Sequence, residues 1–256
     1  MSFKTILYEK KDGIAYVTLN RPEVLNVYNV QMRDDLFEVL TVVRDDPDVR
    51  AMIVSGAGRA YCAGADLSEF GTAPSPVIAR DVRWQRDVWG VLKNLDKLTI
   101  AAMHGYALGS GLELALLCDI RIAAAGTRFG LPETSLGFIP AAGATQSLPR
   151  IIKRGSALRM ILLGERIDAN EALRLGLIHK VVPPDGPSPR SERARNVAEG
   201  PGPALLAEAE SMARRILRAK PLALALAKQA INGGLDLTLE EGLRLESRLL
   251  DLALRL

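Results

Sequence analysis

The sequence is poor in the residues that build disulfide frameworks and metal sites. Its 256 residues include two cysteines, Cys62 and Cys118, and two histidines, His104 and His179. The two distant thiols could form one bridge. The N-terminus, however, has no apolar segment of the kind that directs export, so we expect free thiols and a cytoplasmic location. Two widely separated histidines do not give the ligand spacing of a zinc site, so we expect no metal.

Long apolar runs and a strong net charge are also missing. No run reaches the roughly 18 apolar residues of a membrane span, so we expect no membrane association. The 33 basic and 30 acidic residues leave a net charge of +3, which argues against a nucleic-acid partner. A length of 256 residues suits one large domain, or one domain with an appendage, and a hydrophobic fraction of 48% is ordinary for a globular protein.

Common nucleotide and hydrolase motifs are absent as well. No Gly-Lys pair exists for a phosphate-binding Walker A loop. Residues 56–61 follow a predicted strand, but Tyr61 stands where the dinucleotide fingerprint needs its third glycine. The G-x-S-x-G elbow of serine hydrolases is missing too. The sequence therefore favours neither a nucleotide-binding site nor a serine-hydrolase site.

Strand-like and helix-like segments alternate up to about residue 182, and the remainder reads as helix. This alternation predicts parallel β-α-β units of an α/β fold. The proline-rich stretch 183–189 is the expected linker, followed by helix from about residue 191 to the end. The predicted strands cover residues 13–19, 51–54, 99–103 and 119–125. The predicted helices cover residues 29–43, 81–95, 144–163 and 168–175.

The segment 104–119 (HGYALGSGLELALLCD) organises the rest of the chain. An apolar run breaks on glycine, passes through Gly109-Ser110-Gly111 and enters a helix that carries one acid, Glu113. Such a helix start presents unpaired N–H groups that stabilise negative charge. An alternative is a capping box, in which Ser110 and Glu113 satisfy each other's backbone N–H groups. His104 fits a turn residue better than a catalytic base.

A second glycine loop and a second acid complete a possible site. The loop 63–66 (Ala-Gly-Ala-Asp) also follows a β-like run, and two converging N–H groups form an oxyanion hole. Glu133 follows Pro132 at an expected helix start, where its alternative role is to complement the helix dipole. Two loops and two acids in this order favour an active site.

These residues resemble the crotonase family, the enoyl-CoA hydratases and isomerases. The similarity runs from about residue 5 to about residue 245. It is carried by Asn20-Arg21-Pro22, by residues 59–67 (RAYCAGADL), by residues 104–115 (HGYALGSGLELA), by residues 129–133 (FGLPE) and by residues 143–146 (GATQ).

The resemblance implies a role for each part of the candidate site. The N–H groups of Ala65 and Ser110 would hold the thioester oxygen of an acyl-CoA, and Glu113 and Glu133 would hold a water that adds across the C2=C3 bond. Isomerases of the family usually keep an acid only at the position of Glu133, so both acids favour a hydratase. An isomerase, a hydrolase, a ring-cleaving enzyme and a non-catalytic CoA- or RNA-binding member remain open as alternatives.

The resemblance also implies which residues bind the substrate. The implied CoA contacts are Val24, Leu25, Ala63, Asp66 and Leu67. Implied acyl-pocket residues are Phe70, Trp84 and Ala141, with the alternative that Trp84 and Trp89 serve core or trimer packing.

The resemblance also implies a fold and an assembly. We expect a spiral of repeated β-β-α units over residues 1–190 and a helical oligomerisation region over residues 191–256, forming a homotrimer or a homohexamer. No cofactor is expected, because coenzyme A enters as part of the substrate. Two departures from the family are apparent. The family's Pro-Gly-[AG]-Gly loop reads Pro140-Ala141-Ala142-Gly143 here, and the C-terminal segment that would cover the adenine is short, so that contact is unassigned.

Overall fold

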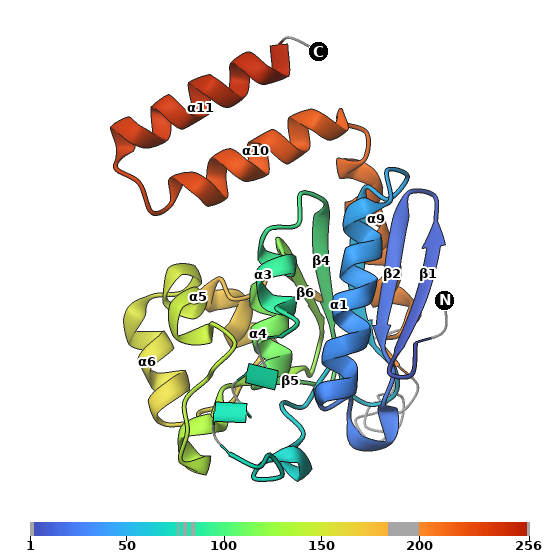
Figure 1. Ribbon diagram of the computed structural model, residues 1–256, viewed down its shortest axis with the longest axis vertical. Coiled ribbons are helices and arrows are strands. Elements are labelled where there is room, and N and C mark those ends of the chain that lie inside the picture. The colour runs from blue at the N-terminus through green and yellow to red at the C-terminus, as the bar shows by residue number, and fades with distance from the viewer. Residues whose placement is uncertain (1–2, 76, 79–80, 83–84, 184–199, 255–256) are drawn as a thin grey trace.

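The computed structural model describes residues 3–75, 77–78, 81–82, 85–183 and 200–254. A six-stranded sheet runs through the molecule in the order β1-β2-β3-β4-β6-β9 (Figure 1). Only β1 and β2 pair antiparallel, and the other neighbours are parallel. Its strands are β1 (Ile6–Lys11), β2 (Ile14–Leu19), β3 (Ala51–Gly56), β4 (Leu98–Met103), β6 (Ile120–Ala124) and β9 (Lys180–Val182). The predicted α/β class and its four strands are confirmed.

A second sheet of three short strands lies next to the site described below. It contains β5 (Tyr106–Leu108), β7 (Arg128–Gly130) and β8 (Ile167–Asp168). In two places along the described chain, one strand belongs to the large sheet, the next strand belongs to the small sheet, and a helix follows. This happens in β4-β5-α4, with α4 at Ser110–Leu116, and in β6-β7-η3, with the 3-10 helix η3 at Pro132–Leu136. These are the β-β-α units that the family resemblance implies.

Helices cover both faces of the large sheet because each strand buries apolar side chains on both sides. On one face, α1 (Val30–Asp45) packs with α4 against side chains such as Val17 and Val54. On the other face, α9 (Pro203–Ile216) places Leu205, Ala209 and Ala213 against isoleucines of β2, β3, β4 and β6. The remaining helices are η1 (Pro22–Val24), η2 (Leu67–Glu69), α3 (Val88–Lys93), α5 (Ala144–Ile151), α6 (Arg154–Leu162), α7 (Ala169–Leu175), α10 (Pro221–Gly234) and α11 (Leu239–Leu254).

Two predicted helices are wrong in their extent. The one predicted over residues 81–95 has no continuous helix in its described part, because the Asp87 side chain caps α3 by accepting a bond from the N–H of Gly90 (2.9 Å). The one predicted over residues 144–163 breaks in two. Pro149 inside α5 supplies no N–H, and Ile152 adopts an extended conformation before α6 begins. The helices predicted over residues 29–43 and 168–175 are confirmed as α1 and α7.

The last two helices form a hairpin that stands away from the sheet, with α10 nearer to it than α11 (Figure 1). Lys228 of α10 connects the hairpin to the part of the molecule that contains the large sheet. Its ammonium donates to a carboxylate oxygen of Asp119 (2.8 Å) and to the carbonyl of Lys97 (2.9 Å). Within the described residues, no helix is long and apolar enough to cross a membrane. The division of the chain at residue 190 into a core and an oligomerisation region stays a prediction.

Candidate functional site

The loop after β3 lies directly along β5 and brings the two glycine loops together. Tyr61 N–H donates to the carbonyl of His104 (2.9 Å), and Leu108 N–H donates to the carbonyl of Cys62 (3.0 Å). A β-carbon on Gly111 would lie 2.4 Å from that Cys62 carbonyl oxygen, so only glycine permits this approach. The start of α4 is therefore fixed against the loop that carries Ala65.

Ala65 and Ser110 lie at this junction. A β-carbon on Gly109 would lie 3.4 Å from the Cα of Gly64, so the residues that precede Ala65 and Ser110 nearly touch. Gly109 has a φ of 48° and a ψ of −127°, a backbone conformation that favours glycine. In the part of the chain that the structure describes, the N–H groups of Ala65 and Ser110 donate to no backbone acceptor. Both N–H groups are thus available to a ligand.

Glu113 does not take part in a capping box, so that alternative is wrong. The N-cap of α4 is Gly109, no side chain caps the helix, and Ser110 is already its first residue. Glu113 is 2% exposed, and one of its carboxylate oxygens, Oε1, accepts bonds from the N–H groups of Ala142 (2.8 Å) and Ala144 (3.1 Å). The chain beyond residue 140 therefore orients this acid.

The alanines of the 140–143 loop fit its backbone. Among the described non-glycine residues, positive φ angles occur only at Asp12, Leu25 and Asn26, so neither Ala141 nor Ala142 needs the freedom of glycine. The position that does need it, with a φ of 106°, keeps Gly143. Although the loop departs from the family's sequence, the N–H of Ala142 still donates to the carboxylate of Glu113.

Glu133 is a buried acid in the first turn of η3, where Pro132 occupies the predicted helix start. It is 7% exposed, and its Oε2 atom has no hydrogen-bond partner among the described residues. Burial, with a smaller contribution from the charge of Glu113, raises the pKa of Glu133 to about 7. A β-carbon on Gly109 would lie 2.9 Å from its other oxygen, Oε1. A carboxyl group next to the start of α4 that titrates near neutral pH suits proton transfer better than a helix-dipole role.

These groups line one cavity of about 410 Å³. Its polar lining comes from Ser110, Glu113 and Glu133, together with the backbone around Ala65. The rest of the wall is formed by Ala63, Gly64, Leu67, Phe70, Gly109, Pro132, Leu136, Phe138, Ile139 and Ala141. The cavity thus has a polar end with two acids and an otherwise apolar wall.

The structure brings together most of the site residues that the sequence predicts. Glu113, Glu133, Ala65, Ser110, Ala63, Leu67, Phe70 and Ala141 all line the cavity. Val24 and Leu25 lie outside its lining, although the carbonyl of Leu25 accepts a bond from Ala63 N–H (3.0 Å). The Asp66 carboxylate accepts bonds from the Ser68 hydroxyl (2.6 Å), the Arg21 guanidinium (3.0 Å) and the Ser68 N–H (3.1 Å). These bonds, the one from the Ser68 hydroxyl most of all, hold the pKa of Asp66 below its usual range.

The aromatic residues near the cavity are only partly those that the sequence predicts. Trp84 lies outside the described residues. Trp89 packs against Tyr28, with ring centroids 5.3 Å apart, and contacts the core, so packing is the correct alternative for this tryptophan. Phe138 lines the cavity and contacts Phe70, but the sequence analysis missed it. Its only sequence signal is a position five residues after Glu133, beyond a glycine that can reverse the chain.

The surroundings of the two cysteines and of His104 indicate structural roles for these residues. Cys62 and Cys118 are free and buried, and burial raises the pKa of their thiols to about 11 and about 12. His104 lies in the turn before β5, where its Nε2 atom is 2.7 Å from the carbonyl oxygen of Gly58. No group of ligating side chains that could hold a metal occurs among the described residues.

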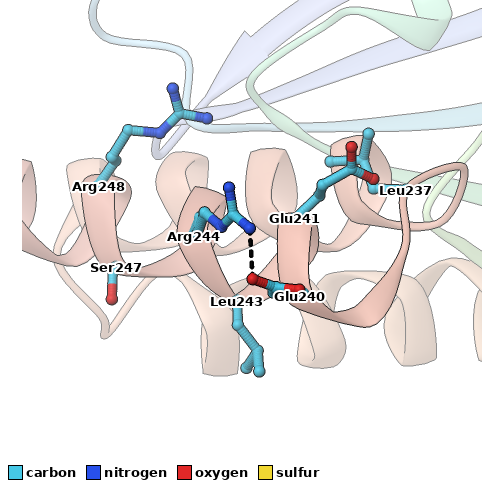
Figure 2. Close-up of a pocket in the computed structure, with 7 residues that line it drawn as sticks. All are labelled: Leu237, Glu240, Glu241, Leu243, Arg244, Ser247 and Arg248. Carbon is cyan, nitrogen blue, oxygen red and sulfur yellow. Dashed lines mark hydrogen bonds and ion pairs between the residues drawn. The ribbon is translucent and has the colours of Figure 1, made fainter.

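A larger hollow of about 870 Å³ lies on α11, away from both acids. All of its lining residues come from α11 and the turn before it, and Figure 2 shows Arg244 and Arg248 projecting on the side opposite to Leu243 and Ser247. Arg244 pairs with Glu240 one helical turn away. Since one helix and its turn supply every wall, this hollow is an open groove and holds no converging reactive groups.

Comparison with known proteins agrees with the fold. A sequence model of the enoyl-CoA hydratase/isomerase family matches residues 9–200. A probable enoyl-CoA hydratase of Mycobacterium bovis is 38% identical over 250 residues, 97% of this chain and 89% of that protein. The short-chain-enoyl-CoA hydratase of Clostridium acetobutylicum is 37% identical over 248 residues, 96% of this chain and 88% of that protein. The solved enoyl-CoA hydratase of Bacillus anthracis has a TM-score of 0.85 at 34% identity, covering 97% of this chain and 90% of that one. Since sequence and fold both match over nearly the whole length, the chain belongs to the enoyl-CoA hydratase/isomerase family.

Proposed function

We propose that this protein adds water to a 2-enoyl-CoA thioester and so produces a 3-hydroxyacyl-CoA. The observation that carries the proposal is the meeting of two buried acids, Glu113 and Glu133, with two unengaged N–H groups in one cavity. The names of the relatives, hydratases of enoyl-CoA thioesters, support the same reaction.

The N–H groups of Ala65 and Ser110 would bind the thioester carbonyl oxygen. As water attacks C3, the electrons of the C2=C3 bond move toward C2 and the carbonyl, so negative charge gathers on that oxygen. Two fixed dipoles stabilise the resulting enolate, and the loss of one such donor typically lowers the rate about 10²–10³-fold. The α4 N-terminus adds its positive end to the same place.

The two acids would divide the proton transfers. Glu113, with one oxygen held by two N–H groups, accepts the proton of the attacking water while the oxygen of that water bonds to C3. Glu133 holds its proton up to about pH 7 and delivers it to C2. One water is thus added, and proton exchange with solvent restores both side chains. This cycle requires no metal or cofactor, and coenzyme A enters as part of the substrate.

The remaining roles follow from position. Backbone groups of Ala63 and Leu67 at the cavity, with Val24, Leu25 and Asp66 nearby, are proposed to contact the CoA moiety. Phe70 and Ala141 are proposed to contact the acyl group. Trp84, which lies outside the described residues, is proposed for the same role from the family resemblance alone. The buried thiols fit a reducing compartment, so we place the protein in the cytoplasm.

We also propose that the chain assembles through its C-terminal hairpin into a homotrimer, or a hexamer of two trimers. Helix α10 has no buried residue and α11 has one, Leu249. Large apolar side chains are exposed on the same hairpin, at Ile231, Leu235, Leu237, Leu239, Leu243, Leu250, Leu252 and Leu254. An exposed apolar surface of this extent is typical of an interface. Light scattering of the parent and of a Leu243→Glu, Leu250→Glu variant tests the assembly, and a monomeric parent would contradict it.

The experiment that tests the reaction is product analysis with a panel of 2-enoyl-CoA thioesters in ¹⁸O-labelled water. Hydration gives a 3-hydroxyacyl-CoA that carries the label at C3, whereas isomerisation moves the double bond and adds no mass. The panel is repeated with Glu113→Gln, with Glu133→Gln and, as a control, with Glu9→Gln on exposed β1. We expect losses of about 10²–10⁴-fold in the first two variants. An unlabelled product, or equal rates in all four proteins, would refute the proposal.

A further inference from the structure

Two phenylalanines from separate loops meet in the wall of the cavity. The rings of Phe70 and Phe138 have centroids 5.1 Å apart and planes tilted by 32°. Phe70 ends η2, in the loop that carries Ala65, and its N–H donates to the carbonyl of Leu67 (3.2 Å). Phe138 follows η3, which carries Glu133. The ring pair therefore joins the loop of one oxyanion donor to the loop of one acid.

The local backbone explains why Phe138 reaches this place. Gly137 ends η3 with a φ of 85°, a left-handed conformation that reverses the chain. Phe138 N–H then donates back to the carbonyl of Glu133 (3.2 Å). Because the turn is closed by this bond, the position of the Phe138 ring is tied to that of the acid.

The wall around the two rings is apolar and open to a ligand. Leu67, Leu136 and Ile139 line the cavity beside them, and each is more than half exposed. Phe70 itself is 48% exposed. Large apolar side chains exposed together in a concave surface mark a binding groove for an apolar ligand. The polar lining lies with Ser110, Glu113 and Glu133, where the thioester and the water belong.

We propose, on the basis of the proposed function, that Phe138 together with Phe70 determines the acyl specificity. The pair selects 2-enoyl-CoA thioesters whose acyl group has six or more carbons and ends in an apolar chain or an aryl ring. A four-carbon acyl group has a single methyl group beyond C3 and offers little surface to two rings. Longer acyl groups gain about fourfold in kcat/KM for each methylene that is fully buried.

The test compares the hydration of crotonyl-, 2-hexenoyl-, 2-octenoyl- and cinnamoyl-CoA by the parent, Phe138→Ala, Phe70→Ala and the double variant. Tyr106→Ala is the matched control, because Tyr106 is an aromatic residue, 39% exposed, outside the cavity lining. We expect the parent kcat/KM to rise at least about tenfold from crotonyl- to octenoyl-CoA. Phe138→Ala is expected to lower octenoyl- and cinnamoyl-CoA turnover about tenfold and crotonyl-CoA turnover less than about threefold. The octenoyl and cinnamoyl arms distinguish a flexible chain from an aryl ring.

Binding of octanoyl-CoA and butyryl-CoA, measured by calorimetry, provides a readout that needs no turnover. The parent is expected to bind octanoyl-CoA at least about tenfold more tightly, and Phe138→Ala is expected to narrow that ratio. A parent that prefers crotonyl-CoA, or a Phe138→Ala variant that loses the same factor with every substrate, overturns the inference. A parent that hydrates nothing but retains the Phe138-dependent binding ratio refutes the reaction and leaves the specificity assignment standing.

Discussion

Replacing Glu133 by glutamine is expected to lower the hydration rate about 10²–10⁴-fold and to stabilise the fold at alkaline pH. In the folded protein, Glu133 keeps its proton up to about pH 7, whereas a carboxyl group of the unfolded chain releases it near 4.5. Between these values the unfolded state binds fewer protons than the folded state. The free energy of unfolding therefore falls as the pH rises through this window, and stays at the lower level above it.

The full effect of this difference is about 3 kcal/mol, at about 1.4 kcal/mol for each pH unit between the two pKa values. Glutamine has almost the same shape and never ionises, so it removes the penalty. In the variant, the side-chain NH2 group can take the place of Oε2, which has no hydrogen-bond partner among the described residues. An unpaired buried NH2 group reduces the gain in stability. We therefore expect a net gain of about 1–3 kcal/mol at pH 8 and a gain close to zero, or a small loss, at pH 4.5.

Urea unfolding at both pH values and one fixed protein concentration measures this directly. Glu9→Gln, on the exposed side of β1, is the control and is expected to change stability little at either pH. A Glu133→Gln variant whose stability relative to the parent is the same at pH 4.5 and pH 8 would refute a raised pKa of Glu133. The proton donor of the proposed reaction would then need another identity.

Three further predictions concern packing at the site and elsewhere in the fold. Gly111→Ala places a methyl group against the Cys62 carbonyl, so we expect a loss of about 1–3 kcal/mol or more in urea unfolding, and an unchanged midpoint would contradict the close approach. Lys228→Met removes the ion pair with Asp119, and faster hydrogen exchange over α10 is the expected result, whereas exchange like that of the parent would show that other contacts hold the hairpin. The thiols of Cys62 and Cys118 are expected to react with a thiol reagent only after unfolding, and rapid labelling of the native protein would contradict their burial.

The parts of the site that are local in sequence were predictable. Gly109, Ser110 and Glu113 fall within five residues, so one strand-turn-helix pattern places them together. The breaks in the helices predicted over residues 81–95 and 144–163 were harder to predict. They depend on a side-chain cap at Asp87 and on the conformation that Ile152 adopts after Pro149, neither of which hydrophobic periodicity reports.

The meeting of the two loops and the two acids was predictable from the family resemblance, but other contacts between chain segments distant in sequence were not. The orientation of Glu113 is fixed by two N–H groups 29 and 31 residues further along the chain. Phe138 meets Phe70 only because two loops converge over the cavity. Likewise, the capping box was a plausible local pattern, and it fails because the loop at Ala142 and Ala144 supplies donors that no local pattern contains.

In the proposed reaction Glu113 and Glu133 act together on one substrate, Glu113 on the attacking water and Glu133 on C2, and a double-variant cycle distinguishes joint from independent action. Hydration of one 2-enoyl-CoA is measured in the parent, in Glu113→Gln, in Glu133→Gln and in the double variant, under conditions where chemistry limits the rate. Groups that act as a unit show strongly non-additive losses. We predict that the double variant loses hardly more activity than the more impaired of the two single variants. Losses that multiply would contradict it, because each acid would then contribute independently of the other.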